Sequence, residues 1–356
     1  MNAIALVMIV RDEARCLARA LASARPWVDE MVVVDTGSVD ETPQIAHDAG
    51  ARVHRFVWID DFSAARNHAL AQTEAPWRLL LDADEWIAQG ADALAALRTT
   101  APDFVGMVRI SSRIDAAGGA QEDAPSWLPR VLPRGVLYEG RIHEQPQPGL
   151  PRRALPLVLG HDGYLGAHMK VKQGRNQRLL ELALAERPDD AYLRYQLGKD
   201  FEVREDFAAA LPHYERAYAA DEQRAAWRHD LVLRLVFTLK RLRRFEQALH
   251  VAQAEMPRWE ASPDFFFTLG DLLLDWALAE PARAAELLPM IESSWLRAIE
   301  IGERPELPDS VRGRGSFLAA HNLAAFHASL GREAEAQRWR EQAAAWRATP
   351  PGTGPG

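Results

Sequence analysis

Short apolar runs alternate with helical patterns through the first half of the chain. Four runs have the length of buried strands: Ala5–Val10, Met31–Val34, Arg52–Trp58 and Trp77–Leu81. Between them, Arg15–Ala24 and Phe62–Gln72 carry apolar residues at helical spacing. Strands that alternate with helices predict βαβ units and a mainly parallel sheet.

The pattern changes near Val171, where the sequence becomes rich in Ala, Leu, Glu and Arg with helical periodicity. A leading leucine and a small alanine recur thirteen residues apart, in the pairs Leu197 and Ala210, Leu235 and Ala248, and Leu323 and Ala336. This spacing resembles the tetratricopeptide repeat, a helix-turn-helix unit whose small residues let paired helices approach closely. A stretched copy is expected from Leu269-Gly270 to Ala298. An unrelated helical bundle remains the alternative.

These two patterns divide the chain. We predict an α/β domain over residues 1–168 and an all-α repeat domain over residues 169–347. The Pro/Gly segment at 348–356 is predicted to be a disordered tail.

Composition narrows the class of protein. The chain has 356 residues, 48% of them hydrophobic, and a net charge of −8, which is typical of a globular protein and argues against nucleic-acid binding. The single cysteine, Cys16, excludes an internal disulfide and fits a reducing compartment. We find no basic leader and no apolar segment long enough to cross a bilayer. A cytoplasmic location is therefore expected, either free or peripheral at the inner membrane face.

A cluster of carboxylates follows the fourth predicted strand. In the stretch LLLDADEW, Asp82, Asp84 and Glu85 come directly after buried leucines. Clustered carboxylates repel one another and are costly to desolvate, so their position at a strand end suggests a cation. Asp82 and Asp84 have the D-x-D form that can hold Mn²⁺ or Mg²⁺, with a phosphate supplying further ligands. A solvated acidic loop is the alternative.

Four ordered segments resemble glycosyltransferase family two: MIVRDEARCLARALAS, VDEMVVVDTGSVDETPQIA, FVWIDDFSAARNHAL and WRLLLDADEW. They are particularly similar to the branch of lipopolysaccharide-core glucosyltransferases and sublancin-type peptide glycosyltransferases. The likeness covers about Ala3–Ile87 and continues more weakly to Tyr164. It implies a GT-A fold, a nucleotide-diphosphate sugar donor, a divalent metal and inversion at the anomeric carbon. Members of the peptide branch also carry tetratricopeptide-like helices after the catalytic domain.

The resemblance also implies roles for individual residues. It places three residues at the border of the base pocket: Val10, Arg11 and Glu13. Asp35 would contact the uracil or ribose, and Asp82 and Asp84 would face the ribose-diphosphate and the metal. Arg66, in the Arg-Asn pair, could meet the diphosphate, because a guanidinium fork suits phosphate oxygens.

Structural explanations remain open for two of these residues. Asp35 could only cap the following helix. Arg66 could only pair with Asp60 or Asp61 on the surface.

Many family members place the general base in a Glu-Asp pair after the metal motif. This sequence has no clear pair of that kind at the expected place. Glu122-Asp123 is such a pair, but it follows a turn on a polar hairpin. The stretch VLYEGRIHEQP resembles the G-x-I-H-E element of this branch, so His143 and Glu144 are predicted to project into the cleft. Glu144 would accept the proton of the acceptor. A structural His-Glu pair that closes a loop is the alternative.

A histidine downstream of the D-x-D often completes the metal sphere in GT-A enzymes. His161 is our candidate, with His168 and a purely structural histidine as alternatives. Four basic residues that follow could reach the diphosphate, although a solvated helix face also explains them: Lys170, Lys172, Arg175 and Arg178.

Together these features predict an inverting glycosyltransferase that uses a UDP-sugar, with glucose or N-acetylglucosamine favoured. The repeats favour a peptide or protein acceptor, because repeat surfaces commonly hold extended peptides. A lipopolysaccharide-core or other glycan acceptor is the first alternative. A repeat-based interaction protein with a dead catalytic domain is the second, but it predicts loss of Asp35 or of the D-x-D, and both are intact. Repeat domains often self-associate, so a homodimer is also expected.

Overall fold

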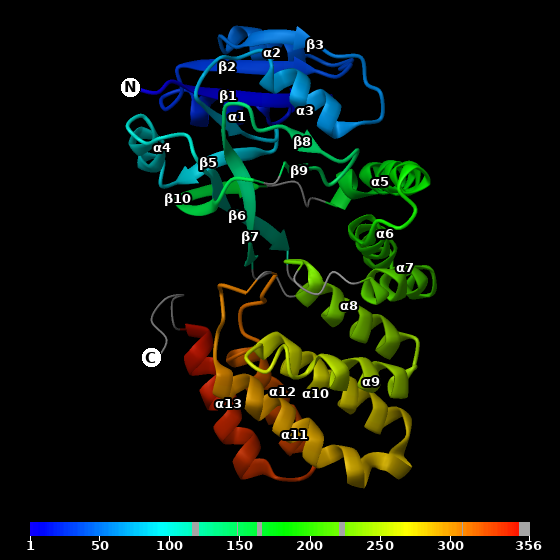
Figure 1. Cartoon of the computed structure of the whole chain (residues 1–356). Coiled ribbons are helices and arrows are strands. Elements are labelled where there is room, and N and C mark those ends of the chain that lie inside the picture. The colour runs from blue at the N-terminus through cyan, green and yellow to red at the C-terminus, as the bar shows by residue number, and fades with distance from the viewer. Residues whose placement is uncertain (116–120, 148, 162–165, 221–224, 308, 349–356) are drawn as a thin grey trace. The chain divides into compact units, whose positions relative to one another are not determined.

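The chain folds into two compact units, Met1–Pro188 and Asp189–Gly356 (Figure 1). The computed structural model describes residues 1–115, 121–147, 149–161, 166–220, 225–307 and 309–348, without the side chains of 112–126 and 166–173. The predicted tail therefore lies almost entirely outside the described residues. Within them, no helix is both long and apolar enough to span a membrane.

The N-terminal unit contains ten strands and five helices among its described residues. The strands are β1 (Ile4–Val10), β2 (Glu30–Asp35), β3 (Arg52–Arg55), β4 (Trp77–Leu80), β5 (Glu85–Gln89), β6 (Val105–Asp115), β7 (Gln121–Pro133), β8 (Tyr138–Glu139), β9 (Gln145–Pro146) and β10 (Arg152–His161). The helices are α1 (Leu17–Ala24), α2 (Thr42–Asp48), α3 (Phe62–Leu70), α4 (Asp92–Leu97) and α5 (Gly166–Glu186).

Eight of these strands form one sheet in the order β3-β2-β1-β4-β7-β6-β10-β5. The first four are mutually parallel, as the alternation of strands and helices predicts. β7 then runs antiparallel to β4 and β6, whereas β10 runs parallel to β6 and antiparallel to β5. The sheet is thus parallel in its first half and mixed in its second, in keeping with the predicted GT-A class.

The side chains of β1 alternate between the two faces of the sheet, and helices cover both faces. Ile4, Leu6 and Met8 pack in the cluster that contains residues of α1, α2 and α4. Ala5 and Val7 point to the opposite face and pack with residues of α3. A strand buried on both faces must be apolar throughout, which is the pattern that predicts a parallel strand.

One predicted strand is shorter than expected. Arg52–Trp58 was predicted as a strand, but β3 ends at Arg55. Val57 is 85% exposed, so this end of the predicted strand is a surface loop, and of its apolar residues Phe56 packs against the core.

The first unit also extends one helix beyond the predicted domain boundary at 168/169. α5 belongs to it, and ion pairs link Arg178 of this helix to Asp60 and Glu186 to Arg141. These charges join α5 to the loops before α3 and after β8.

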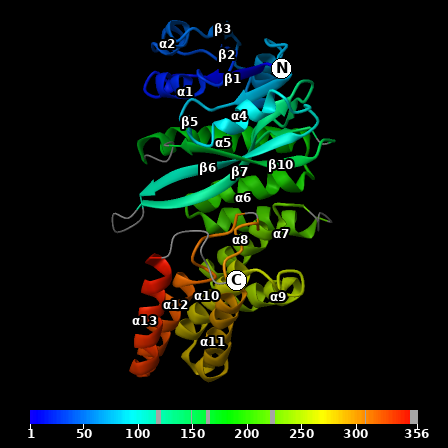
Figure 2. The same ribbon diagram turned by 90° about the vertical axis from the view of Figure 1, so that its left-hand side faces the viewer.

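The C-terminal unit is helical among its described residues. It comprises α6 (Ala191–Val203), α7 (Phe207–Ala219), α8 (Arg228–Arg241), α9 (Phe245–Glu255), α10 (Pro263–Ala279), the short 3-10 helix η1 (Pro281–Arg283), α11 (Ala284–Ile301), α12 (Phe317–Ser329) and α13 (Glu333–Ala348). Consecutive helices pack as hairpins, which Figure 2 shows from the side.

The small residues of the repeat lie where paired helices touch. A Cβ atom added to Gly198 of α6 would lie 2.5 Å from the ring of Tyr214 on α7. One added to Gly270 of α10 would lie 2.4 Å from Trp295 on α11. The predicted tetratricopeptide-like architecture is confirmed, including the stretched copy formed by α10 and α11.

Substitution of Gly198 tests this packing. We expect Gly198→Ala to destabilise the protein by about 1–2 kcal/mol, because overpacking outweighs the better helix propensity of alanine. Gly174 of α5 provides a matched control, since nothing lies within 4 Å of its added Cβ. Gly174→Ala should leave stability unchanged or slightly raise it. Urea unfolding followed by circular dichroism measures both, and equal effects would contradict the proposed contact.

Candidate functional site

The predicted site residues gather where the parallel strands of the first unit end. Val10 and Asp35 are register partners at the carboxyl ends of β1 and β2. Asp82 and Asp84 follow β4, and His161 ends β10. Because β10 runs in the same direction as β4, all these positions lie along one edge of the sheet. Open α/β sheets bind ligands at this edge.

The acidic loop after β4, residues 82–85, is held together by hydrogen bonds between its first and last residues. The backbone N–H of Glu85 donates to the carbonyl of Asp82 at 3.0 Å. The carboxylate of Glu85 in turn accepts the N–H of Asp82 at 3.0 Å. Glu85 is only 2% exposed, so its carboxylate is a structural brace of the loop rather than an open ligand.

Two buried arginines converge on these carboxylates. Arg130 Nη2 of β7 lies 2.5 Å from Asp82 Oδ2 and 2.6 Å from Glu85 Oε1. Arg66 Nη2 of α3 lies 3.4 Å from the other oxygen of Asp82. Both arginines are more than nine-tenths buried. Among the described residues, Arg66 Nη1 and Arg130 Nε are buried without a hydrogen-bond partner.

This arrangement sets the charges of the acidic loop. Burial alone would raise the pKa of Asp82, but Arg130 and Arg66 hold it well below its usual range. Burial raises the pKa of Glu85, although Arg130 opposes that shift. Asp82 is therefore ionised at neutral pH and held by two guanidinium groups, while its side chain remains 40% exposed.

Asp84 makes a different contact from its neighbours. Its Oδ2 lies 3.4 Å from Nε2 of His161, because β5 and β10 pair with His161 opposite Glu85. Burial alone would lower the pKa of His161, but the hydrogen bond and negative charge of Asp84 raise it. Trp86 fixes this register: a Cβ on Gly160 would lie 2.3 Å from its indole ring.

The donor set fits a cation that is shared with a substrate. Carboxylate oxygen suits Mn²⁺ and Mg²⁺, and neutral imidazole is the commonest metal ligand among protein side chains. No group of three or more His, Cys, Asp or Glu side chains suited to a metal occurs in the described part of the chain. A metal held by Asp84 and His161 would thus depend on ligand oxygens, such as those of a diphosphate, for the rest of its sphere.

The base candidates lie on the same side of the site. Glu144 Oε1 is 2.8 Å from Arg66 Nε, and its side chain is 11% exposed. Arg66 therefore contacts both the D-x-D carboxylate and Glu144. It does not make the surface pair that was the alternative: Asp60 pairs with Arg178, and Asp61 caps α3. His143 is exposed and has a positive φ of 51°.

The remaining nucleotide-pocket candidates lie at the carboxyl ends of β1 and β2 or in the stretch between β1 and α1. Asp35 is buried and accepts the N–H groups of Gly37 and Ser38, so it shapes its own loop rather than capping α2. Val10 accepts a hydrogen bond from Thr36. Arg11 is exposed, and Glu13 accepts the thiol hydrogen of Cys16.

Several candidates fall outside the described side chains, and the structure provides no test of them: Glu122, Asp123, His168, Lys170 and Lys172.

Arg130 contacts the acidic loop, a role that was not predicted from the sequence. An arginine between apolar residues in the strand sequence LPRVL is a signal for a buried ion pair, because an unpaired charge is rarely buried. Its partners could not be read from the sequence, since they depend on the antiparallel pairing of β7 with β4.

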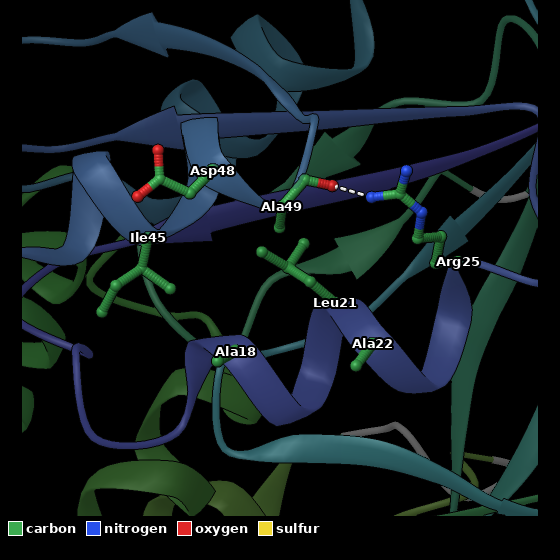
Figure 3. Close-up of a pocket in the computed structure, with 7 residues that line it drawn as sticks. All are labelled: Ala18, Leu21, Ala22, Arg25, Ile45, Asp48 and Ala49. Atoms are coloured by element: carbon green, nitrogen blue, oxygen red, sulfur yellow. Dashed lines mark hydrogen bonds between the residues drawn. The ribbon is translucent and has the colours of Figure 1, made fainter.

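A separate surface groove lies between α1 and α2 (Figure 3). Its lining is apolar apart from Arg25 and Asp48, and Arg25 donates to the carbonyl of Ala49. None of the predicted site residues lines it, so it is distinct from the edge of the sheet described above.

Comparison with known proteins shows which family the N-terminal unit resembles. Residues 5–139 match the model described as Glycosyl transferase family 2. The N-terminal unit contains a family 2 glycosyltransferase domain. The match ends at Glu139, so it includes the acidic loop, Arg66 and Arg130 but stops before Glu144 and His161.

Two relatives extend the likeness across both units. A TPR repeat-containing protein of Synechococcus elongatus is 34% identical over 270 residues, which cover 72% of this chain and 66% of that protein. The SPbeta prophage-derived glycosyltransferase SunS of Bacillus subtilis is 23% identical over 70% of this chain and 63% of its own length. The chain thus spans slightly less than two thirds of each of these relatives.

A solved structure, glucosyl-3-phosphoglycerate synthase from Mycobacterium tuberculosis in complex with Mn²⁺, UDP and glucosyl-3-phosphoglycerate, is 23% identical. The match covers 32% of this chain and 45% of that chain, with a TM-score of 0.27.

Substitution of Asp84 tests whether its carboxylate binds a metal ion. On the expected metal assignment, Asp84→Asn should weaken Mn²⁺-dependent binding of UDP by about tenfold or more, because it would remove one of the two donors, Asp84 and His161, that lie together among the described residues. Glu85→Gln is the matched control: it keeps a similar shape at a buried, structural position and should preserve the Mn²⁺ dependence. Isothermal titration of UDP with and without Mn²⁺ measures both. Equal binding by wild type and Asp84→Asn would show that Asp84 is not a ligand.

Proposed function

We propose that this protein is a metal-dependent, inverting glycosyltransferase that moves a sugar from a UDP-sugar to a peptide or protein acceptor. The observation that carries the proposal is the Asp84–His161 pair beside the arginine-held Asp82 at the carboxyl edge of the sheet. The family 2 domain supports the reaction class.

The donor would bind along this edge from the first strand to the acidic loop. Val10, Arg11 and Glu13 would border the base, and Asp35 would face the uracil or ribose. Asp82, ionised and partly exposed, would accept a ribose hydroxyl. Asp84 and His161 would hold Mn²⁺ or Mg²⁺, which when bound neutralises charge on the diphosphate leaving group. Arg66 Nη1, buried without a partner among the described residues, offers a further donor to a phosphate oxygen.

The acceptor would approach from the side of Glu144. Inversion requires the acceptor to attack the anomeric carbon opposite to the leaving diphosphate, and its proton must leave as the bond forms. Glu144 would accept that proton, and Arg66 holds its carboxylate in place. His143, the neighbouring residue in the same turn, is the second candidate for this role.

The helical unit would select the acceptor. Stacked helical repeats present extended surfaces that suit peptides. The relatives that match across both units include one named for its TPR repeats and one named as a glycosyltransferase. Glucose and N-acetylglucosamine are the favoured sugars.

A donor-hydrolysis screen tests the reaction class without knowledge of the acceptor. Purified full-length protein is incubated with UDP-, GDP- and dTDP-sugars, with Mn²⁺, with Mg²⁺ and with a chelator. We expect slow release of UDP from UDP-glucose or UDP-N-acetylglucosamine that depends on the metal. The absence of release and of UDP binding under all these conditions would overturn the proposal.

Replacement of Glu144 tests the base. Glu144→Gln retains the shape and can still accept a hydrogen bond from Arg66, but it cannot take a proton. We expect the turnover number for a hydroxyl acceptor to fall about a hundred- to ten-thousand-fold. The affinity for the UDP-sugar should change little. Transfer at the wild-type rate would place the base elsewhere, with His143 and Asp123 as the next candidates.

A further inference from the structure

Three residues of helix α3 form hydrogen bonds with the hairpin that carries Glu144. The N–H of Phe62 donates to the carbonyl of Arg141 at 2.8 Å. Arg66 binds the carboxylate of Glu144. Asn67 binds the backbone of Tyr138 in both directions: its Nδ2 donates to the carbonyl at 2.9 Å, and its Oδ1 accepts the N–H at 2.8 Å.

Tyr138 is a suitable anchor for this turn. It is 5% exposed, and its hydroxyl donates to the carbonyl of Pro129, directly before Arg130. Its ring lies 5.2 Å from the guanidinium of Arg66. Burial raises the pKa of Tyr138 to about 12, so the hydroxyl remains protonated and able to donate.

The hairpin itself contains only a two-residue strand pairing, so few backbone hydrogen bonds within it stabilise the turn. Tyr138 and Glu139 pair with Gln145 and Pro146, so residues 140–144 form the loop of a two-residue ladder. Gly140 and His143 have positive φ values of 102° and 51°. Such a short hairpin is marginal by itself, so the position of Glu144 depends on contacts from outside it.

We propose that Asn67 is a positioning residue for Glu144, an inference that rests on the proposed function. Arg66 binds only the end of the Glu144 side chain, so it orients the carboxylate but does not hold the backbone of the turn. Asn67 has a short side chain that binds two backbone atoms of one residue. It therefore fixes where the hairpin begins, and through it where the carboxylate of Glu144 lies relative to the donor.

The test compares Asn67→Asp and Asn67→Ala with the control Asn2→Ala. Asp keeps an acceptor for the N–H of Tyr138 but loses the donor to its carbonyl, with little change in size. Asn2 is also half-buried and donates its amide to a backbone carbonyl, that of Thr100, at 2.7 Å. Asn2→Ala thus removes a similar bond at a residue that makes no contact with the hairpin.

Hydrogen exchange reports on the position of the turn independently of activity. We expect faster amide exchange over residues 138–147 in both Asn67 variants and no change in Asn2→Ala. Unchanged exchange in Asn67→Asp and Asn67→Ala would overturn the inference, whether or not the protein transfers sugar.

Turnover then links the turn to the reaction. The Asn67 variants should lose about ten- to a hundred-fold in kcat while UDP-sugar affinity stays the same, since small misplacements of a reacting group are costly. In the Glu144→Gln background, Asn67→Asp should have no further effect. An independent, additive loss in the double variant, or wild-type kcat despite faster exchange, would also overturn the inference. A wild-type protein that fails the donor screen instead overturns the proposed function, and the exchange measurement still decides whether Asn67 orders the turn.

Discussion

The ion pairs of Arg66 and Arg130 with Asp82, Glu85 and Glu144 join segments that are far apart in the sequence. Two guanidinium groups face three carboxylates, so the cluster is short of positive charge. Burial raises the pKa of Glu85, and the nearby charge of Asp82 raises it further, although Arg130 opposes both effects. Removing Arg130 would leave the buried Glu85 without an arginine, and removing Arg66 would do the same to Glu144. Either loss is far more costly than losing a surface ion pair. The geometry of the whole edge of the sheet therefore depends on these two side chains.

The regular elements of the first unit could be predicted because burial imposes a simple pattern. The runs IALVMIV and WRLL are apolar because both faces of their strands are covered, and their strands agree closely with the prediction. The prediction failed at the end of Arg52–Trp58, where Val57 belongs to an exposed loop. Sequence pattern reports hydrophobicity, and it does not tell whether a neighbouring element is available to cover it.

The site was predictable to the extent that the family resemblance assigned roles to its residues. Asp84 and His161, two of the three expected metal ligands, lie close together, whereas the third, Asp82, pairs with Arg66 and Arg130. Their role in binding metal remains a proposal. The contacts of Arg66 were not predictable, because Glu144 is 78 residues away and reaches it through a hairpin. The same holds for Arg130, whose partners are set by strand pairing rather than by spacing. The repeat unit was easier to predict, since Gly198 and Gly270 each pack on an aromatic side chain of the helix that follows.

The pairing of β5 has a consequence for the order in which this protein matures. β5 follows directly from the acidic loop, yet its strand partner among the described residues is β10, which ends at His161. Chains are synthesised from the N-terminus, and domains generally fold as units as they emerge. Until β10 has been made, a nascent chain would have a complete parallel half-sheet but an unpaired β5 and an Asp84 without His161. Competence to bind a donor would then appear only after β10 has emerged, as α5 is being synthesised.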